Sequence, residues 1–304
     1  MKKISIIFLT LFLVLGASEC SAQSQNLQIF SADNANGKIN AKTIQKAFND
    51  IGVIVDVNND MNSIFSKRFG KVYHKKYNLA IFTNEKLVKK LMSKYPSVGM
   101  ITPLSMSIYS GKNKSINIST LSLAGMARLT KIPLNNPDLK AYAKLVDEAL
   151  HKALVNGKYL SVKHNPKAKV SVTKFAMEVE LEDGDTYAEA IKSFEEEFEG
   201  ELGPVGYLIP KKYSFKHPDY DAFDTYSIIR FNAIFPVSKN HPEAGAYAPF
   251  SVVVYKKKDE DSMHIMYPSI DNWITDLDLK DATAVKEVHK TQSMLKDILT
   301  ELTE

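Results

Sequence analysis

Cysteine is almost missing from this sequence, and that absence excludes several kinds of chemistry. Cys20 is the only cysteine in 304 residues, so the chain forms no disulfide with itself and has neither a CxxC redox pair nor a CxxCH haem-attachment motif. An HExxH motif is also absent, and the seven histidines are scattered. The sequence therefore predicts no metal site and no cofactor.

Charge of one sign is scarce as well. The formal net charge is +4, and basic residues alternate with acidic ones along most of the chain. Proteins that bind nucleic acid neutralise its phosphates with a basic stripe or patch, and this sequence has no such stripe, so we expect no nucleic-acid partner. The 44% hydrophobic and 24% charged fractions are those of a globular chain, and the length allows two domains.

Long apolar runs are absent except at the N-terminus. Lys2 and Lys3 precede an apolar run from Ile4 to Leu15, and small residues follow at positions 16–18. This order is typical of a secretion signal, and the run is short for a membrane span. We therefore expect residues 1–22 to be a signal peptide and the mature protein to be periplasmic or secreted.

Two kinds of cleavage fit the end of this leader. Cys20-Ser21-Ala22 places small residues before Gln23, as ordinary signal cleavage requires. Cys20 is alternatively the lipidated first residue of a lipoprotein, although Glu19 departs from the usual pattern before such a cysteine. The alternative location is then a lipid-anchored one. We expect membrane contact only through the leader or a lipid on Cys20.

Self-similarity is the most informative feature of the chain, because the two halves share residues in the same order. The segment from Tyr77 to Phe82 resembles the segment from Tyr226 to Phe231. Further pairs recur at nearly constant spacing. These pairs are Gly37 and Gly184, Ala41 and Ala188, Ile44 and Ile191, Pro96 and Pro242, Gly99 and Gly245, Pro103 and Pro249, Ser105 and Ser251, Tyr109 and Tyr255, Leu150 and Leu295, and Leu154 and Leu299.

Hydrophobic periodicity predicts similar elements in each half. Helices are expected after Asn40 and after the capping box Thr186-x-x-Glu189. The expected strands are 27–32, 77–82, 104–109 and 115–120, then 175–181, 226–231, 250–255 and 262–266; long helices close the halves near 139–154 and 285–302. The sequence thus predicts an α+β fold with two tandem copies of an antiparallel sheet, each with helices packed on one face.

The copies are expected to occupy residues 26–157 and 174–304, joined by a linker at 158–173. The second copy differs from the first in two places. Pro236 lies inside one amphipathic segment, so we expect that helix to be shortened or lost, and residues 211–221 are expected to form a loop. The second copy should then pack its opened face against the first copy or another molecule. The apolar residues expected at this contact are Phe215, Phe223 and Phe235.

Several motifs of the first copy identify a family. They are Gly52-Val53 before an alternating strand, the strand from Tyr77 to Phe82, a helix ending in Pro96-Ser97-Val98-Gly99, the strand entry Pro103-Leu104 and the hairpin at Tyr109. Residues 27–154 resemble the domain of unknown function 302 family. The family usually has Gly-Asn-Pro where this chain has Thr83-Asn84-Glu85. The resemblance implies a compact α+β domain with helices on an antiparallel sheet, and it brings no catalytic residue.

The densest polar cluster runs from His217 to Asp224. Closely spaced oxygen ligands can hold a hard cation, but the cluster lacks the glycine and terminal glutamate of an EF-hand. We interpret it as a solvated acidic turn and keep four of its residues as candidate binding residues. These residues are His217, Asp219, Asp221 and Asp224.

Repeated polar residues are interpreted as structural. Ser105 and Ser251 each follow a proline, but no GxSxG elbow surrounds them. Tyr109 and Tyr255 fit the ends of strands, with a packed ring and a wet hydroxyl. Repetition within a tandem repeat is explained by strand geometry alone.

The sequence shows no converging nucleophile, base or metal set. We therefore favour a non-catalytic exported module that binds a small molecule or a protein of unknown identity, with the cleft between the two copies as its site. The alternative is an enzyme whose groups come from distant segments. A pocket that holds several titratable side chains with perturbed pKa values would favour the enzyme.

Overall fold

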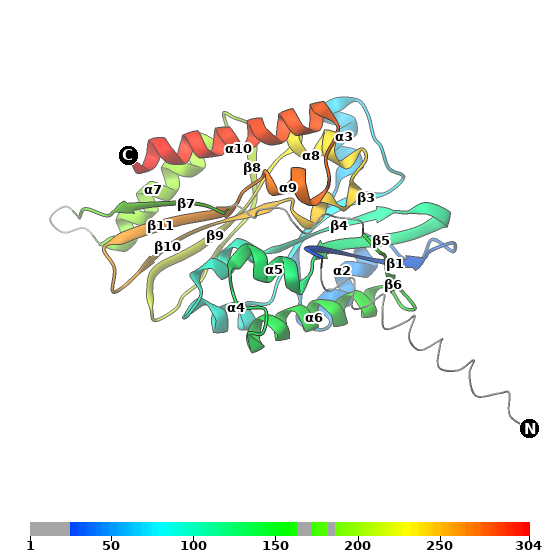
Figure 1. Ribbon diagram of the computed structural model, residues 1–304, viewed down its shortest axis with the longest axis horizontal. Coiled ribbons are helices and arrows are strands. Elements are labelled where there is room, and N and C mark those ends of the chain that lie inside the picture. The colour runs from blue at the N-terminus through cyan, green and yellow to red at the C-terminus, as the bar shows by residue number, and fades with distance from the viewer. Residues whose placement is uncertain (1–24, 163–171, 182–185) are drawn as a thin grey trace, which may run out of the picture.

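Two antiparallel sheets and the helices around them make up the computed structural model, which describes residues 25–162, 172–181 and 186–304 (Figure 1). The fold is α+β, as expected. The predicted leader at 1–22, with Cys20, lies outside the described residues, as does most of the predicted linker. None of the helices in the described part of the chain has the length and apolar character needed to cross a bilayer.

The first half builds a six-stranded sheet. Its elements are β1 (Leu27–Asp33), α2 (Ala41–Asn49), β2 (Ile54–Asp60), α3 (Met61–Phe69), β3 (Tyr77–Thr83), α4 (Glu85–Met92), the 3-10 helix η1 (Pro96–Ile101), β4 (Leu104–Ser110), η2 (Lys112–Lys114), β5 (Ser115–Leu121), α5 (Leu123–Thr130), α6 (Pro137–Ala153) and β6 (Lys158–Tyr159). The strand order is β2-β3-β4-β5-β1-β6. The short strand β6, at the start of the predicted linker, pairs with β1.

The second half builds a five-stranded sheet. Its elements are β7 (Val172–Glu178), α7 (Tyr187–Leu202), β8 (Tyr207–Ser214), β9 (Tyr220–Arg230), α8 (Phe231–Ser238), η3 (Pro242–Ala246), β10 (Phe250–Lys257), β11 (Ser262–Pro268), α9 (Asn272–Asp276) and α10 (Ala282–Thr303). The strand order is β8-β9-β10-β11-β7. Counted from the start of each half, the first five strands therefore follow the same order across both sheets.

Local sequence signals set the starts of the predicted helices. The side chain of Asn40 accepts hydrogen bonds from the backbone of Lys42 and Thr43, and Thr43 bonds back to the backbone of Asn40. Thr186 and Glu189 form the expected capping box at α7. Each cap satisfies backbone donors that the first helical turn leaves without partners.

The prediction that residues 211–221 form a loop is wrong, because both ends of this segment lie in strands. Residues 211–214 belong to β8 and pair with β9, and Tyr220 already belongs to β9. Apolar and polar residues alternate only weakly in β8, because β8 is an edge strand that is half exposed along most of its length. Pro210 lies where the pairing with β9 is irregular, so its missing N–H does not interrupt the ladder.

The predicted loss of a helix at Pro236 is also wrong. Helix α8 has eight residues, as α4 has. Pro236 stands near its C-terminal end, so only the carbonyl of exposed Asn232 loses its intrahelical donor. Burial of Ala233, Ile234 and Val237 holds the remaining turns in place.

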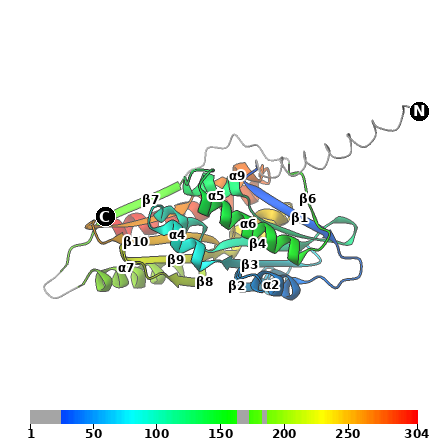
Figure 2. The ribbon, with the colours of Figure 1, turned by 90° about the horizontal axis from the view of Figure 1, so that it is seen from below.

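Helices α2 and α6 lie on one face of the first sheet, and helices α7 and α10 lie on one face of the second. In the first half, Phe48 of α2 packs edge-on against Phe82 of β3, with ring centroids 5.3 Å apart. In the second, Phe198 of α7 packs the same way against Tyr226 of β9 at 5.4 Å. In Figure 1, α7 and α10 run along one side of the molecule and α2 and α6 along the other, with the strands between. From below, the strands of the two halves lie at opposite ends of the long axis (Figure 2).

The remaining faces of the two sheets meet through the 3-10 helices. Helix η1 packs on β10 of the second half, and η3 packs on β4 and β5 of the first. A β-carbon on Gly99 would lie 2.4 Å from Cγ2 of Val253, and one on Gly245 would lie 2.4 Å from Cβ of Ser107. Both contacts therefore require glycine.

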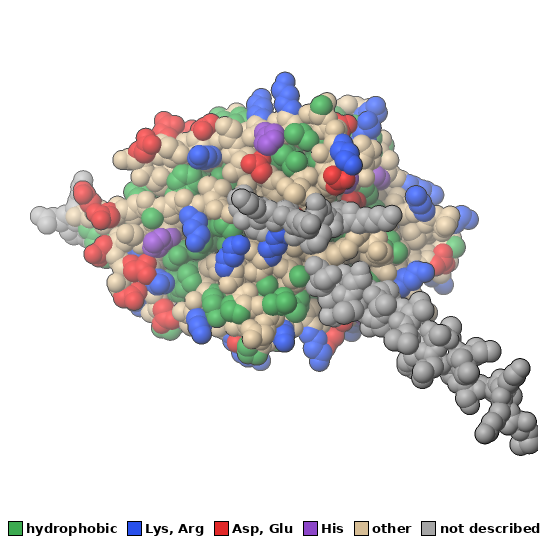
Figure 3. Space-filling view, in the orientation of Figure 1, with side chains coloured by type: hydrophobic (Ala, Val, Ile, Leu, Met, Phe, Trp, Pro, Cys, Tyr) green, Lys and Arg blue, Asp and Glu red, His purple; other side chains and the backbone are tan. Residues whose placement is uncertain are grey.

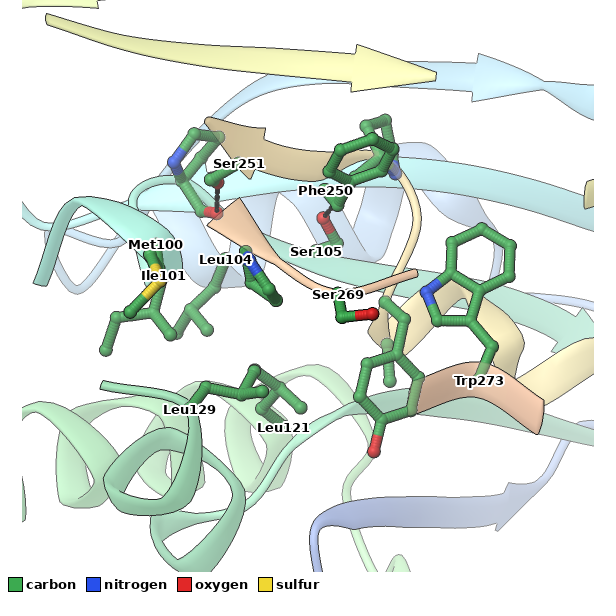
Figure 4. Close-up of a pocket in the computed structure, with 15 residues that line it drawn as sticks. Met100, Ile101, Leu104, Ser105, Leu121, Leu129, Phe250, Ser251, Ser269 and Trp273 are labelled. Carbon is green, nitrogen blue, oxygen red and sulfur yellow. Dashed lines mark hydrogen bonds between the residues drawn. The ribbon is translucent and has the colours of Figure 1, made fainter. Parts of the chain in front are cut away.

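Two serines bond across the same interface. The hydroxyl of Ser105 donates to the carbonyl of Pro249, and the hydroxyl of Ser251 donates to the carbonyl of Pro103 at 2.9 Å (Figure 4). The residues that recur in the two halves thus make reciprocal contacts with each other. This arrangement agrees with the structural role assigned to the serines.

Aromatic contacts extend the interface. Phe235 of α8 stacks on Phe69 of α3, with centroids 4.1 Å apart, and packs edge-on against Phe65. Phe235 therefore makes the contact expected of it. Phe215 and Phe223 are buried, and their ring contacts are with each other and with neighbours inside the second half.

Replacing the glycine of this contact tests how much the interface contributes to stability. Gly245→Ala should lower the free energy of unfolding by about 1–3 kcal/mol, because the new methyl group meets Ser107, including its backbone nitrogen at 2.7 Å. Gly200→Ala is the control, since a β-carbon there meets nothing within 4 Å. The control lies in α7 and should raise stability by up to about 1 kcal/mol. Urea titrations measure both changes, and equal effects would contradict a tight interface.

Candidate functional site

The four candidate residues of the acidic turn do not form one site. Nδ1 of His217 lies 3.6 Å from a carboxylate oxygen of Asp219, while Nε2 lies 2.9 Å from the hydroxyl of Ser93 in the first half. Asp221 accepts a hydrogen bond from Lys256 at 2.8 Å. Asp224 lies three residues further along β9, beyond an irregularity in the pairing with β10, and its charge acts on Glu195 of α7.

The structure thus brings His217 and Asp219 together, whereas Asp221 pairs with Lys256 and Asp224 lies near Glu195. Across the described ranges, no three His, Cys, Asp or Glu side chains are grouped as a metal ion would require. A binding role for these four residues stays a prediction.

A second polar cluster lies between α7 and the second sheet. The ammonium group of Lys212 donates to Glu195 at 2.8 Å and to Glu199 at 3.2 Å. The hydroxyl of Tyr226 donates to Glu199 at 3.0 Å. Burial, and then the nearby charge of Asp224, raises the pKa of Glu195 to about 7, although Lys212 opposes the shift.

This cluster meets one criterion for the enzyme alternative, because it contains a carboxyl group with a raised pKa. Glu195 is only 5% exposed, however, and the helix that carries it covers the group. Glu195, Lys212 and Tyr226 line none of the cavities described below. We interpret the cluster as an ionic contact that holds α7 on the sheet.

The cavity at the centre of the interface is small. It lies beside Ser105, Ser251, Leu129 and Trp273 (Figure 4), and its volume of about 20 Å³ suits one water molecule. Both halves contribute to its wall. A ligand larger than water has no room there, so this cavity belongs to the core.

A larger cleft opens between the two halves, with a volume of about 490 Å³. We call it the basic cleft. Its lining residues are Lys94, Tyr95, Pro96, Ser97, Met100, Thr130 and Lys131 from the first half, and Val172, Lys174, Tyr255 and Met266 from the second. In Figure 3, Lys and Arg side chains gather between the positions that β7 and α5 occupy in Figure 1, with hydrophobic side chains beside them.

Three separate elements supply the lysines of the basic cleft. Lys94 follows α4, and its ammonium group lies 5.6 Å from the centre of the Tyr95 ring. Lys131 caps the C-terminus of α5 in a left-handed conformation, with a φ of 60°. Lys174 lies on the edge strand β7. Within the described residues, no carboxylate lies within ion-pair distance of these three ammonium groups.

The floor of the basic cleft is aromatic and apolar. The ring of Tyr255 stacks on His264, with centroids 5.0 Å apart, and Met100 and Met266 lie beside it in the lining. Burial, and then the charge of Glu260, raises the pKa of Tyr255 to about 12. The hydroxyl therefore stays protonated at neutral pH. Cations at the rim above such a floor suit an anion that has an apolar or aromatic body.

Sequence reasoning missed the basic cleft. Lys94, Lys131 and Lys174 share no motif and no spacing, because a helix end, a helix cap and a strand register bring them together. Repetition had marked only Pro96 and Tyr255 of the lining, and the repetition of Tyr255 pointed to strand geometry.

Comparison with known proteins supports one domain assignment. Residues 40–157 match the family described as Domain of unknown function DUF302, so the resemblance seen in the first copy is confirmed over that range. A similar solved structure is the crystal structure of the uncharacterized conserved protein DUF302 from Bacillus stearothermophilus. It is 12% identical with a TM-score of 0.33, and the match covers 43% of this chain and 98% of that chain. No curated protein matches this chain.

The Glu195 contact should make stability depend on pH. A carboxyl group whose pKa is raised to about 7 by folding keeps its proton in the folded state while the unfolded chain loses it above pH 4.5. The free energy of unfolding should therefore fall as pH rises from about 4.5 to 7, with a limiting slope of about 1.4 kcal/mol per pH unit.

Glu195→Gln should remove this fall, because the amide does not titrate and its oxygen still accepts from Lys212. Glu197→Gln, on an exposed position of the same helix, is the control. Urea titrations between pH 4.5 and 8 compare the two variants with the unaltered protein. A pH profile of Glu195→Gln that parallels the control would show that Glu195 is ionised throughout.

Proposed function

We propose that this protein is a non-catalytic exported module that binds a small anionic ligand in the basic cleft. The observation that carries the proposal is the convergence of Lys94, Lys131 and Lys174 on a floor formed by Tyr255 and two methionines. Ligand pockets typically combine an apolar lining with a few polar groups that fix orientation. The ligand class is therefore an anion, such as a carboxylate, sulfonate or phosphate, on an apolar or aromatic body.

A cleft within the second half, lined by residues that follow α8 and α9, supports this assignment by contrast. Its volume is about 340 Å³, and its lining includes Glu243, Asp278 and Asp281. Its basic groups are paired: Lys280 lies 2.9 Å from Asp278, and His241 lies 3.2 Å from Glu243. This cleft therefore carries carboxylates, while the lysines of the basic cleft have no ion pair within the described part of the chain.

The expected affinity for an anionic ligand has an electrostatic contribution and a hydrophobic contribution. An exposed ion pair contributes about 0.2–1 kcal/mol, so three lysines together account for roughly a tenfold change in affinity. The three ammonium groups also repel one another, and an anion relieves that repulsion. Contact with Tyr255, Met100 and Met266 adds a hydrophobic contribution that salt does not screen.

We propose further that the chain consists of two tandem copies of one domain, the second diverged. The family match covers only the first. In support, the five principal strands have the same order in both sheets. Residues that recur in sequence also occupy matching places at the interface, as Gly99 and Gly245 do. Helix α3, between β2 and β3, has no counterpart between β8 and β9, which is the main structural difference.

Anionic probes test the proposed ligand site. Anilinonaphthalene sulfonate carries one sulfonate on an aromatic body, so it should bind the mature protein with a rise in fluorescence. The triple variant Lys94→Gln, Lys131→Gln and Lys174→Gln should weaken this binding about tenfold. Added salt should weaken binding to the unaltered protein more than to the variant.

A matched control removes the same charge elsewhere. Lys286, Lys290 and Lys296 are exposed on α10, and their triple replacement by glutamine should leave the affinity within about twofold. Circular dichroism melts confirm that both variants are folded, because partly unfolded proteins also bind this dye. Equal losses of affinity in the two triple variants would mean that net charge, rather than the basic cleft, attracts the probe.

Export is the second part of the proposal, and the leader-like residues 1–22 support it. Intact-mass analysis of the protein isolated from the cell that naturally makes it should show a chain that begins near Gln23. A chain that begins at Cys20 with an added lipid mass would identify the lipid-anchored alternative. A native chain that retains Met1 to Leu15 would contradict export with loss of the leader.

A further inference from the structure

A second cavity, separate from the basic cleft, lies where β2 and β3 of the first half meet β8 and β9 of the second. We call it the apolar pocket, and its volume is about 270 Å³. Its lining residues are Val57, Asn59, Met61, Leu79, Ile81, Leu208, Ile209, Pro210, Ile229, Phe231 and Pro249. We propose that the apolar pocket binds a small neutral molecule, an alkyl chain or a single aromatic ring.

The wall of the apolar pocket consists of the faces that the two sheets turn toward each other. Leu79 and Ile81 are two residues apart on β3, so their side chains lie on the same face of the sheet. Ile229 lies on β9, and all three residues are buried. Met61 and Phe231 stand at the starts of α3 and α8 and contribute to the same lining. Neither half encloses the space alone, so the pocket exists only because the two halves are joined.

The chemistry of the lining selects against charge. Asn59 is the only lining residue with a polar side chain, apart from the thioether of Met61. An ion placed among aliphatic side chains loses its hydration and gains no partner, so the occupant is neutral. Asn59 is exposed at the rim, where its amide can bond one small polar group such as a hydroxyl.

The size of the pocket points to a small molecule. An apolar cavity of about 150 Å³ holds benzene, and the apolar pocket is larger than that. It is too small to receive a helix, whose diameter with side chains is about 10–12 Å. The hydroxyl of Tyr213 donates to Asp56 at 2.7 Å and ties β8 to β2, so the edge strands beside the pocket are already joined.

A route into the pocket is visible at its rim. Leu208 is 44% exposed although it is a large apolar residue, and it belongs to the lining. The apolar pocket and the basic cleft share no residue. They lie toward opposite edges of the second sheet, beside β8 and β7 respectively. The two sites can therefore be occupied at the same time.

Octanol is the probe for this pocket, since it has an alkyl chain and one hydroxyl. We expect octanol to raise the melting temperature of the mature protein and to shift NMR methyl signals of Leu79, Ile81 and Ile229. Octanoate, with the same chain length and a charged head, should shift these signals at least tenfold more weakly at equal concentration. No shift of these methyl signals by octanol would overturn the proposal.

Leu208→Asp places a charge at the rim and should weaken octanol binding at least tenfold. Leu134→Asp is the matched control, because Leu134 is 54% exposed and does not line the pocket. Its octanol affinity should equal that of the unaltered protein. Equal affinity in the two variants would place octanol elsewhere and overturn the proposal. If Leu208→Asp does not fold, Val57→Phe, which narrows the pocket with an apolar ring, takes its place.

Two further readouts separate this proposal from others. Leu208→Asp should bind anilinonaphthalene sulfonate normally, and the triple lysine variant should bind octanol normally, so failure at one site is distinguishable from failure at the other. Analytical ultracentrifugation tests a second copy of the chain as the occupant. Dimers that dissociate on addition of octanol would show that the pocket is a protein interface and would overturn the small-molecule assignment.

Discussion

The 3-10 helix of each half packs on the sheet of the other half, and the rest of this structure depends on this pair of contacts. Each half inserts a glycine against the other's sheet, and each offers a serine hydroxyl to a proline carbonyl across the interface. These contacts cover the sheet faces that their own helices leave open. Because a β-carbon at Gly99 or Gly245 would overlap its neighbour, the close approach leaves only a water-sized space at the centre.

Space for ligands appears only away from that centre. The basic cleft and the apolar pocket both draw their walls from two halves, toward opposite edges of the second sheet. Their chemistry differs because different elements reach each place: helix ends and an edge strand bring lysines to one, and alternating strand residues bring aliphatic side chains to the other. A separate cleft within the second half has the opposite charge, because its lining includes Asp278 whereas the lining of the basic cleft includes Lys131.

Burial also changes the ionisation of polar residues in the second half, as Glu195 shows. Glu195 and Lys212 look like ordinary surface charges in sequence, but α7 lies on the sheet and encloses the carboxyl group. The resulting rise in its pKa records the loss of hydration rather than a catalytic arrangement. A perturbed pKa indicates a site only when a cavity gives a substrate access to the group.

The sequence by itself determined most of the elements and their order. Asn40 and Thr186 predicted where two helices begin, and alternating apolar residues predicted strands such as 77–82. Both kinds of signal act over only a few residues. Sequence-based prediction failed at β8, where pairing with β9 forms the strand despite Pro210. It also failed at α8, where burial of Ile234 keeps the helix despite Pro236. Only the tertiary structure decided the sites. Lys94, Lys131 and Lys174 converge through a helix end, a cap and a strand register, and residues so distant in sequence carry no local signal of their proximity.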